Sequence, residues 1–197
     1  MENEFRPLDD VIDELREQIE TDVKAGFLEA WDVEQSAVDA FQDRVEPAAL
    51  EAAAERLTEE ALAAHARAQA TWPAETDCDR LDAAFAALEE RGIVARQHFS
   101  CCNNCGSQEI WGEVDEARAE GRVVRGCTFY HEQDTDCAVE GGGVHLGYQS
   151  VAEGDEAMAA VGREIVDVLR AHGLHPEWNG SPKLRVHVPM DWKRRRA

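Results

Sequence analysis

The hydrophobic pattern changes its period near residue 92, and this change constrains the fold more than any other feature. Before it, apolar side chains recur at three- and four-residue spacing, as on one face of an amphipathic helix. The clearest run contains Leu8, Ile12, Leu15, Ile19, Val23 and Phe27. After it, short segments that alternate or are rich in β-branched residues, typical of strands, lie between helical stretches. The sequence therefore predicts a helical region followed by a domain with helices and strands.

Breaks in the first region divide it into several helices. Residues 33–70 predict one or two helices interrupted by a proline, and a Trp-Pro pair ends the region, because proline disfavours helical angles in the residue before it. A further helix opens with a capping box at Thr76 and closes at Gly92. We therefore predict an acidic helical region over residues 1–75 and an α+β domain with a Cys/His cluster over residues 76–197.

The elements after residue 92 follow the order of a ferredoxin-like fold. The predicted order is strand 93–99, helix 108–119, strand 123–131, strand 144–148, helix 155–172 and a terminal hairpin of 174–178 with 184–188. Apart from one additional edge strand, this order is the βαββαβ arrangement. We expect an α+β protein containing a ferredoxin-like βαββαβ domain with an extra C-terminal hairpin strand. Two helices would then cover one face of its sheet.

The charge balance argues against a nucleic-acid partner, and the absence of a long apolar run argues against a membrane partner. The chain has 41 acidic and 20 basic side chains, a net charge of −21, whereas nucleic-acid binding needs Lys and Arg to neutralise phosphates. Residues 1–91 carry −17 of this charge and residues 92–197 carry −4. No run approaches the roughly 18 apolar residues of a membrane span. A basic protein is the partner that such a surface would attract, and the basic residues 193–196 are expected to be solvated or paired with the acidic half.

The beginning of the chain and the cysteine count bear on location. The first residues lack the basic stretch followed by an apolar one that marks a secretory signal, so we expect a cytoplasmic protein. In a reducing compartment, the six cysteines would be free thiols, metal ligands or redox groups rather than disulfides.

Residues 98–106, His-Phe-Ser-Cys-Cys-Asn-Asn-Cys-Gly, contain the sharpest chemical motif of the chain. A Cys-x-x-Cys pair followed by glycine is the turn of zinc knuckles, where backbone amides can point at the thiolates. This turn supplies two ligands, and tetrahedral zinc needs two more. The candidates for the missing ligands are His98, Cys101, Cys127, His131 and Cys137. A structural metal and unliganded reduced cysteines both stay open as interpretations.

The same cysteines are also candidates for thiol chemistry. Cys102 and Cys105 have the spacing of a redox dithiol and lie where a strand leads into a helix, whose N-terminus lowers a thiol pKa. His131 and Asp134 follow the second strand, and parallel pairing would bring this candidate base and its carboxylate to the same edge as the cysteines. The alternative is structural: Asp134 or Thr135 caps a short helix, and His131 only hydrogen-bonds within the turn.

Three segments, residues 99–106, 129–135 and 141–148, together resemble an uncharacterised bacterial family, the domain-of-unknown-function family numbered 6891. The resemblance covers about residues 80–192 and, more loosely, the N-terminal helices. The matching positions are Cys101, Cys102, Cys105, His131, Gln133, Asp134 and Thr135, whereas Cys127, Cys137 and His98 do not clearly match. The resemblance implies that a shared metal or catalytic function rests on a set of three cysteines with His131. It implies no known activity.

These observations lead to three functional hypotheses. The first is a non-enzymatic binding or regulatory domain, whose Cys/His cluster ties the first loop to the end of the second strand and holds a structural zinc. The second is a thiol-dependent enzyme or redox sensor that uses Cys102 and Cys105 with His131 as the base. The third, by fold analogy alone, is an acidic ferredoxin-like inhibitor or regulator of a basic protein partner. Zinc is the one cofactor that the sequence suggests.

Overall fold

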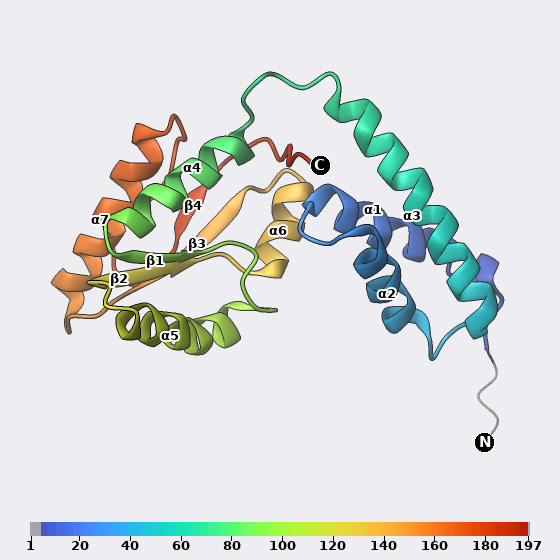
Figure 1. The fold of residues 1–197 in the computed structure, drawn as a ribbon, viewed down its shortest axis with the longest axis horizontal. Helices are drawn as coiled ribbons and strands as arrows, with labels where there is room; N and C mark the ends of the chain where they lie inside the picture. The colour runs from blue at the N-terminus through green and yellow to red at the C-terminus, as the bar shows by residue number, and fades with distance from the viewer. Residues whose placement is uncertain (1–4, 197) are drawn as a thin grey trace. The chain divides into compact units, whose positions relative to one another are not determined.

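The computed structural model describes residues 5–196, which form two compact units (Figure 1). The helical unit comprises the described residues up to Pro73 together with those from Lys193, and the sheet unit comprises Ala74–Trp192. Within the described residues there are seven α-helices and one four-stranded mixed sheet, so the protein is a mixed α/β protein. None of the described helices is long and apolar enough to cross a membrane.

The helical unit is built from α1 (Ile12–Ala25), α2 (Ala30–Phe41) and α3 (Pro47–Gln69), each of which packs against the other two. The predicted amphipathic first helix and the interruption at the proline are confirmed. The first helix ends at Gly26, whose φ of +79° suits glycine. Glu46 caps the start of α3 by accepting hydrogen bonds from two backbone N–H groups. The apolar core includes Leu15, Ile19, Val33, Leu50 and Leu57.

The sheet unit contains β1 (Ile93–Arg96), β2 (Gly126–Phe129), β3 (Val144–Ser150) and β4 (Val186–Val188), paired in that order. The first two strands are parallel, and the other two neighbouring pairs are antiparallel. The helices of this unit are α4 (Asp77–Glu90), α5 (Asn103–Ala119), α6 (Glu132–Val139) and α7 (Asp155–Ala171). The sheet lies between α4 and α7 on one face and α5 on the other (Figure 1).

The strand order differs from the ferredoxin-like order that the sequence predicted. In a split βαβ unit another strand lies between the two parallel strands, whereas here β1 and β2 pair directly, with Ile93 opposite Gly126. The helices α5 and α7 also lie on opposite faces instead of sharing one. The prediction was wrong because hydrophobic alternation indicates which face of a strand is buried but not which strand lies beside it.

Three predicted elements also change. The first strand ends at Arg96, because His98 and Ser100 take positive φ angles that extended strands do not have. The helix α6 separates the second and third strands, as in the structural alternative for this segment. The terminal hairpin is reduced to one isolated bridge between Glu177 and His187, since the next hydrogen-bonded pair would need a donor from Pro189, which has no N–H. The described sheet therefore has no extra hairpin strand.

Candidate functional site

The candidate site lies at the carboxyl edge of the parallel strands, where α5 and α6 both begin. Backbone hydrogen bonds continue the pairing beyond the strands: Phe99 N–H donates to Tyr130 C=O at 2.9 Å, and Glu132 N–H donates to Ser100 C=O at 3.1 Å. The loop that carries the cysteines is therefore attached to the start of α6. Parallel strands place their carboxyl ends at one edge, so the predicted juxtaposition of the two motifs at this edge is observed.

The backbone of this loop adopts an uncommon conformation at two residues that are not glycine. His98 has a φ of +50° and Ser100 has a φ of +64°, both in the left-handed region. The His98 Nδ1 atom lies 2.9 Å from Thr135 Oγ1, and that hydroxyl also donates to the His131 carbonyl at 3.4 Å. Residues other than glycine keep a left-handed backbone conformation only where surrounding contacts hold them in it, and such residues are often found at functional sites. The hydrogen bond to α6 is one such contact.

Three of the predicted ligands come together. The donor atoms of Cys101, Cys102 and Cys105, named here the cysteine cluster, all lie within 4.8 Å of one another. Cys102 is the N-cap residue of α5 and Cys105 lies in its first turn, so the helix start positions both sulfurs. Cys101 is exposed, and the other two are partly exposed. The cluster is therefore accessible to a small ligand.

The electrostatics of the cysteine cluster distinguish its members. The pKa of the Cys102 thiol is lowered, first by the backbone N–H of Cys105, then by the Cys105 side chain and the backbone N–H of Asn104. The pKa of Cys105 is raised to about 11 by the neighbouring Cys101 and Cys102 side chains. The exposed N–H groups at a helix start favour a thiolate. The start of α5 therefore favours the thiolate form of Cys102 over that of Cys105.

The other predicted ligands lie outside this group. Among the described residues, the cysteine cluster is the one group of three or more His, Cys, Asp or Glu donors close enough to hold a metal ion. His131 is not a member, so the structure assembles three cysteines without the histidine that the family resemblance implied. Cys127 is fully buried on β2, and burial raises the pKa of its thiol to about 12. His98 and Cys137 are not members either.

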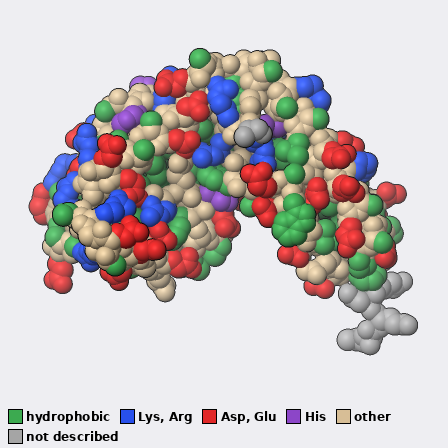
Figure 2. Space-filling view, in the orientation of Figure 1, with side chains coloured by type: hydrophobic (Ala, Val, Ile, Leu, Met, Phe, Trp, Pro, Cys, Tyr) green, Lys and Arg blue, Asp and Glu red, His purple; other side chains and the backbone are tan. Residues whose placement is uncertain are grey.

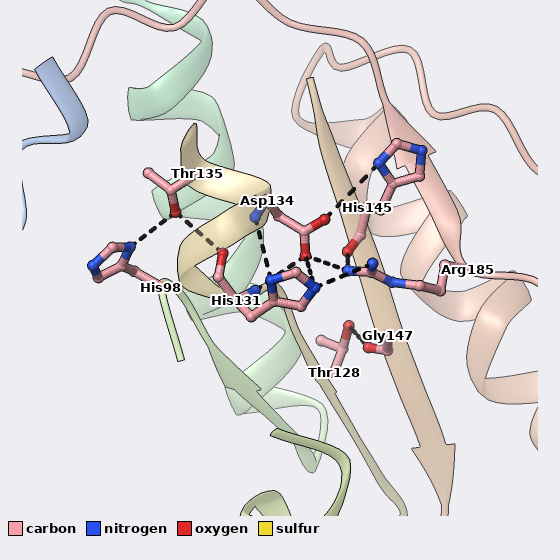
Figure 3. Close-up of polar contacts among 8 residues, drawn as sticks. All are labelled: His98, Thr128, His131, Asp134, Thr135, His145, Gly147 and Arg185. Carbon is pink, nitrogen blue, oxygen red and sulfur yellow. Dashed lines mark hydrogen bonds and ion pairs between the residues drawn. The ribbon is translucent and has the colours of Figure 1, made fainter. Parts of the chain in front are cut away.

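His131 and Asp134 instead form the capping box of α6 (Figure 3). The Asp134 N–H donates to His131 Nδ1 at 3.3 Å, and the His131 N–H donates to Asp134 Oδ2 at 3.2 Å. Because Nδ1 accepts, the neutral ring carries its proton on Nε2, which lies 3.0 Å from Asp134 Oδ2. Both ring nitrogens are thus engaged in the cap. This geometry agrees with the structural alternative in forming a short capped helix, but the N-cap residue is His131 and not Asp134 or Thr135. It does not present a free lone pair for a general base.

Two partly exposed residues, Arg185 and His145, complete this network, and sequence reasoning did not find either of them. The Arg185 guanidinium donates to the Asp134 carboxylate and to the His145 carbonyl (Figure 3). The pKa of His131 is lowered, first by burial; Arg185 and His145 lower it further and Asp134 opposes them. Arg185 lies 51 residues after Asp134. No local spacing links the two residues, so their contact could be found only in the folded chain.

The fold and the site together define a mixed α/β protein with a partly exposed cluster of three cysteines at the carboxyl edge of two parallel strands. The chain belongs to the family described as Domain of unknown function (DUF6891), whose model matches residues 8–196. The predicted family resemblance is therefore confirmed, and the match extends over both units. Comparisons with curated proteins and with solved structures gave no match.

Proposed function

We propose that the sheet unit is a metal-binding domain without catalytic activity, in which Cys101, Cys102 and Cys105 hold a soft metal ion, with Zn²⁺ as the first candidate. The observation that carries the proposal is the convergence of three sulfur donors within 4.8 Å. Zinc–sulfur bonds of about 2.3 Å place tetrahedral sulfurs roughly 3.8 Å apart. The cluster needs to contract by only about 1 Å to reach this geometry.

The electrostatics of the cluster also fit a cation. The pKa of Cys105 is raised to about 11, first by side-chain hydrogen bonds with Cys101 and Cys102 and then by repulsion between the neighbouring thiolates. A divalent ion bound between the sulfurs would reverse the repulsion, because metal binding favours deprotonated thiols. Thiolate donors select soft ions over Mg²⁺ or Ca²⁺. The donor set therefore matches Zn²⁺ better than a hard cation.

The number of donors bears on the kind of site. Structural zinc has four protein ligands, whereas a site with three protein ligands keeps a fourth position for water or another molecule. Among the described residues no fourth donor joins the cysteine cluster. We therefore propose an open site, with a role in regulation or metal-dependent binding and an external fourth ligand.

The test is metal content measured by mass spectrometry on purified protein, together with cobalt substitution followed by thiolate-to-metal absorption. We expect one metal ion per chain and a lower melting temperature after chelation. Cys102→Ser should lose the metal and the cobalt absorption, whereas Cys137→Ser, a free cysteine outside the cluster, should keep both. Protein that binds no stoichiometric metal, or a Cys102→Ser variant that binds as well as the wild type, would contradict the proposal.

A second candidate function is dithiol redox chemistry, and the lowered pKa of Cys102 beside Cys105 favours it. In this reaction the Cys102 thiolate attacks one sulfur of a substrate disulfide and releases the other as a thiolate. Cys105, after losing its proton to solvent, attacks Cys102, and the second substrate thiolate leaves. The two cysteines are oxidised to a disulfide and the substrate disulfide is reduced by two electrons. His131 is not needed as a base, because Cys102 is the group whose thiolate is stabilised.

Alkylation with iodoacetamide against pH, read by peptide mass spectrometry, tests this second function. Cys102 in the metal-free protein should react with an apparent pKa below the usual value of about 8.5, and Cys105 above it. Exposed Cys101 provides a comparison within the same loop. A Cys102 that titrates at or above the usual value would remove the case for redox activity and would leave the metal proposal standing.

A further inference from the structure

Residues 193–196, named here the basic segment, belong to the helical unit and not to the sheet unit that precedes them in sequence. This segment is Lys-Arg-Arg-Arg. It runs beside the C-terminal ends of α1 and α3, where Gly26, His65 and Gln69 contact it. The helical unit therefore holds an arginine-rich stretch of chain, contributed by the far end of the sequence.

The backbone of the basic segment is held by side chains of α3. The Gln69 amide donates to Arg196 C=O at 3.0 Å and accepts from Arg196 N–H at 2.8 Å. The His65 Nε2 atom lies 3.1 Å from Arg194 C=O, so a protonated Nε2 donates to it. These contacts recognise the peptide backbone and do not depend on which side chains the segment carries. The side-chain amide of Gln69 therefore offers the Arg196 backbone one donor and one acceptor, as the backbone of a neighbouring strand would.

The arginine side chains meet aromatic rings and carbonyl groups. The Arg194 guanidinium lies 4.1 Å from the centre of the Phe27 ring, and that of Arg195 lies 6.0 Å from the Trp72 ring. The Arg196 guanidinium donates to the carbonyl groups of Val23, at 3.3 Å, and Leu28. Flat guanidinium groups stack on aromatic faces and offer several donors, which an ammonium does not match. This surface therefore selects arginine.

The helical unit has a core that does not include the basic segment. The buried apolar cluster of this unit is drawn from the described residues up to Ala61. Residues 1–73 carry 19 acidic and 6 basic side chains, and acidic groups are spread over the visible face of the molecule (Figure 2). An acidic unit with an arginine-selective surface attracts basic chains. The basic segment therefore lies on the surface of this unit, outside its buried apolar core.

We propose that this surface, formed by Phe27, His65, Gln69 and Trp72, is a docking site for an extended arginine-rich segment of a partner protein, and that residues 193–196 occupy it as a built-in competitor. A tethered segment has an effective concentration near the millimolar range, so a partner must displace it. The docking site is distinct from the cysteine cluster, and its test does not depend on metal binding.

The test uses a fluorescein-labelled peptide of residues 191–197, Asp-Trp-Lys-Arg-Arg-Arg-Ala, and fluorescence anisotropy near physiological salt. The full-length Arg194→Ala/Arg196→Ala variant, which weakens the built-in competitor, should bind the peptide at least tenfold more tightly than the wild type. Adding Gln69→Ala should abolish this gain, whereas adding Gln35→Ala, on the exposed surface of α2, should not. A peptide with lysine in place of each arginine should bind at least tenfold more weakly.

Several results would overturn the proposal. The wild type and the double variant could bind the peptide with equal affinity, or adding Gln69→Ala could leave the affinity unchanged. Either result would mean that the net negative charge of the protein, and not this surface, attracts the peptide. Amide exchange provides a measurement on the unmodified protein: the Arg196 N–H should exchange faster than the core of α1. If the Arg196 N–H exchanged only when the whole protein unfolds, the basic segment would be a permanent part of the fold and not a displaceable competitor. A wild-type dimer whose basic segments cross-link to the other copy's Gln69 would identify a second copy as the occupant.

Discussion

At the scale of single residues, Asp134 is a buried carboxylate on which several contacts converge. It is 5% exposed, caps the start of α6, and accepts from the Arg185 guanidinium and the His131 backbone. The sequence paired His131 with Asp134 only as a candidate base and its carboxylate, whereas the structure makes the two residues the capping box of α6. The sequence could not predict Arg185, because the charge that neutralises this carboxylate comes from a distant residue near β4.

Asp134→Asn should lower the free energy of unfolding of the sheet unit by about 2 kcal/mol. The amide keeps the size of the side chain and one capping acceptor but leaves Arg185 facing a neutral group in a buried site. Urea unfolding followed by circular dichroism measures this loss. Glu132→Gln, at an exposed position in the same helical turn, should change the stability by less than about 0.5 kcal/mol. Equal stability of the two variants would contradict the prediction.

The pH dependence of stability should carry a contribution from His131. Burial lowers the pKa of this ring in the folded protein, whereas in the unfolded chain it takes up a proton near pH 6.5. The unfolded state therefore binds more protons, so the contribution is present above about pH 6.5 and is lost as the pH falls through the folded pKa. His65 and His145 have lowered pKa values and act in the same direction.

His131→Asn, which keeps a good N-cap residue, should make the fall in unfolding free energy between about pH 7 and about pH 5 shallower than in the wild type. Urea midpoints measured at several pH values provide the comparison. His175→Gln, at an exposed position, serves as the control and should retain the wild-type slope. An unchanged slope in His131→Asn would mean that this ring does not contribute.

At the scale of elements, the close approach of α5 to the sheet depends on Gly106. A Cβ atom at this position would lie 2.4 Å from a ring carbon of Phe129 on β2. Gly106 follows Cys105 directly, so the same glycine that completes the Cys-x-x-Cys-Gly motif also allows the helix to pack. The motif predicted the turn from local conformation, whereas the packing role follows from a strand that lies more than twenty residues later.

Gly106→Ala should destabilise the sheet unit by about 1–3 kcal/mol, because the added methyl group overpacks the contact between α5 and Phe129. Gly112→Ala is the matched control on the same helix, since an added Cβ there meets no atom within 4 Å. This control should raise stability by about 0.5–1 kcal/mol through helix propensity. Denaturant unfolding of both variants measures the two effects. Destabilisation by both substitutions, or by neither, would contradict the packing argument.

At the scale of the whole molecule, the net charge of −21 opposes folding through repulsion among carboxylates. The helical unit contains exposed ion pairs, such as Arg16 with Glu60, that contribute little. Glu34, Glu51 and Glu55 have no ion pair among the described residues. The two units are compact separately, and we propose that they are separate domains with a boundary near the predicted one.

Added NaCl should raise the lowest melting midpoint of the protein by several degrees. Raising the concentration from about 0.01 M to about 1 M shortens the screening length from about 30 Å to about 3 Å, which weakens repulsion between exposed carboxylates. Differential scanning calorimetry measures the midpoint. The Glu34→Gln/Glu51→Gln/Glu55→Gln variant should show a smaller rise. A midpoint that falls with salt would mean that attractive ion pairs outweigh the repulsion.

Local pattern in the sequence was enough to identify most of the helices and strands, the capping box at Thr76 and the cysteine motif. Each of these depends on residues that are close in the chain, where period, capping and turn chemistry act. Tertiary contacts decided the strand order, the exclusion of His131 from the cysteine cluster, the role of Arg185 and the docking of residues 193–196 on the helical unit. These features join residues far apart in the sequence, so their energies come from packing and charge pairs that no local spacing encodes.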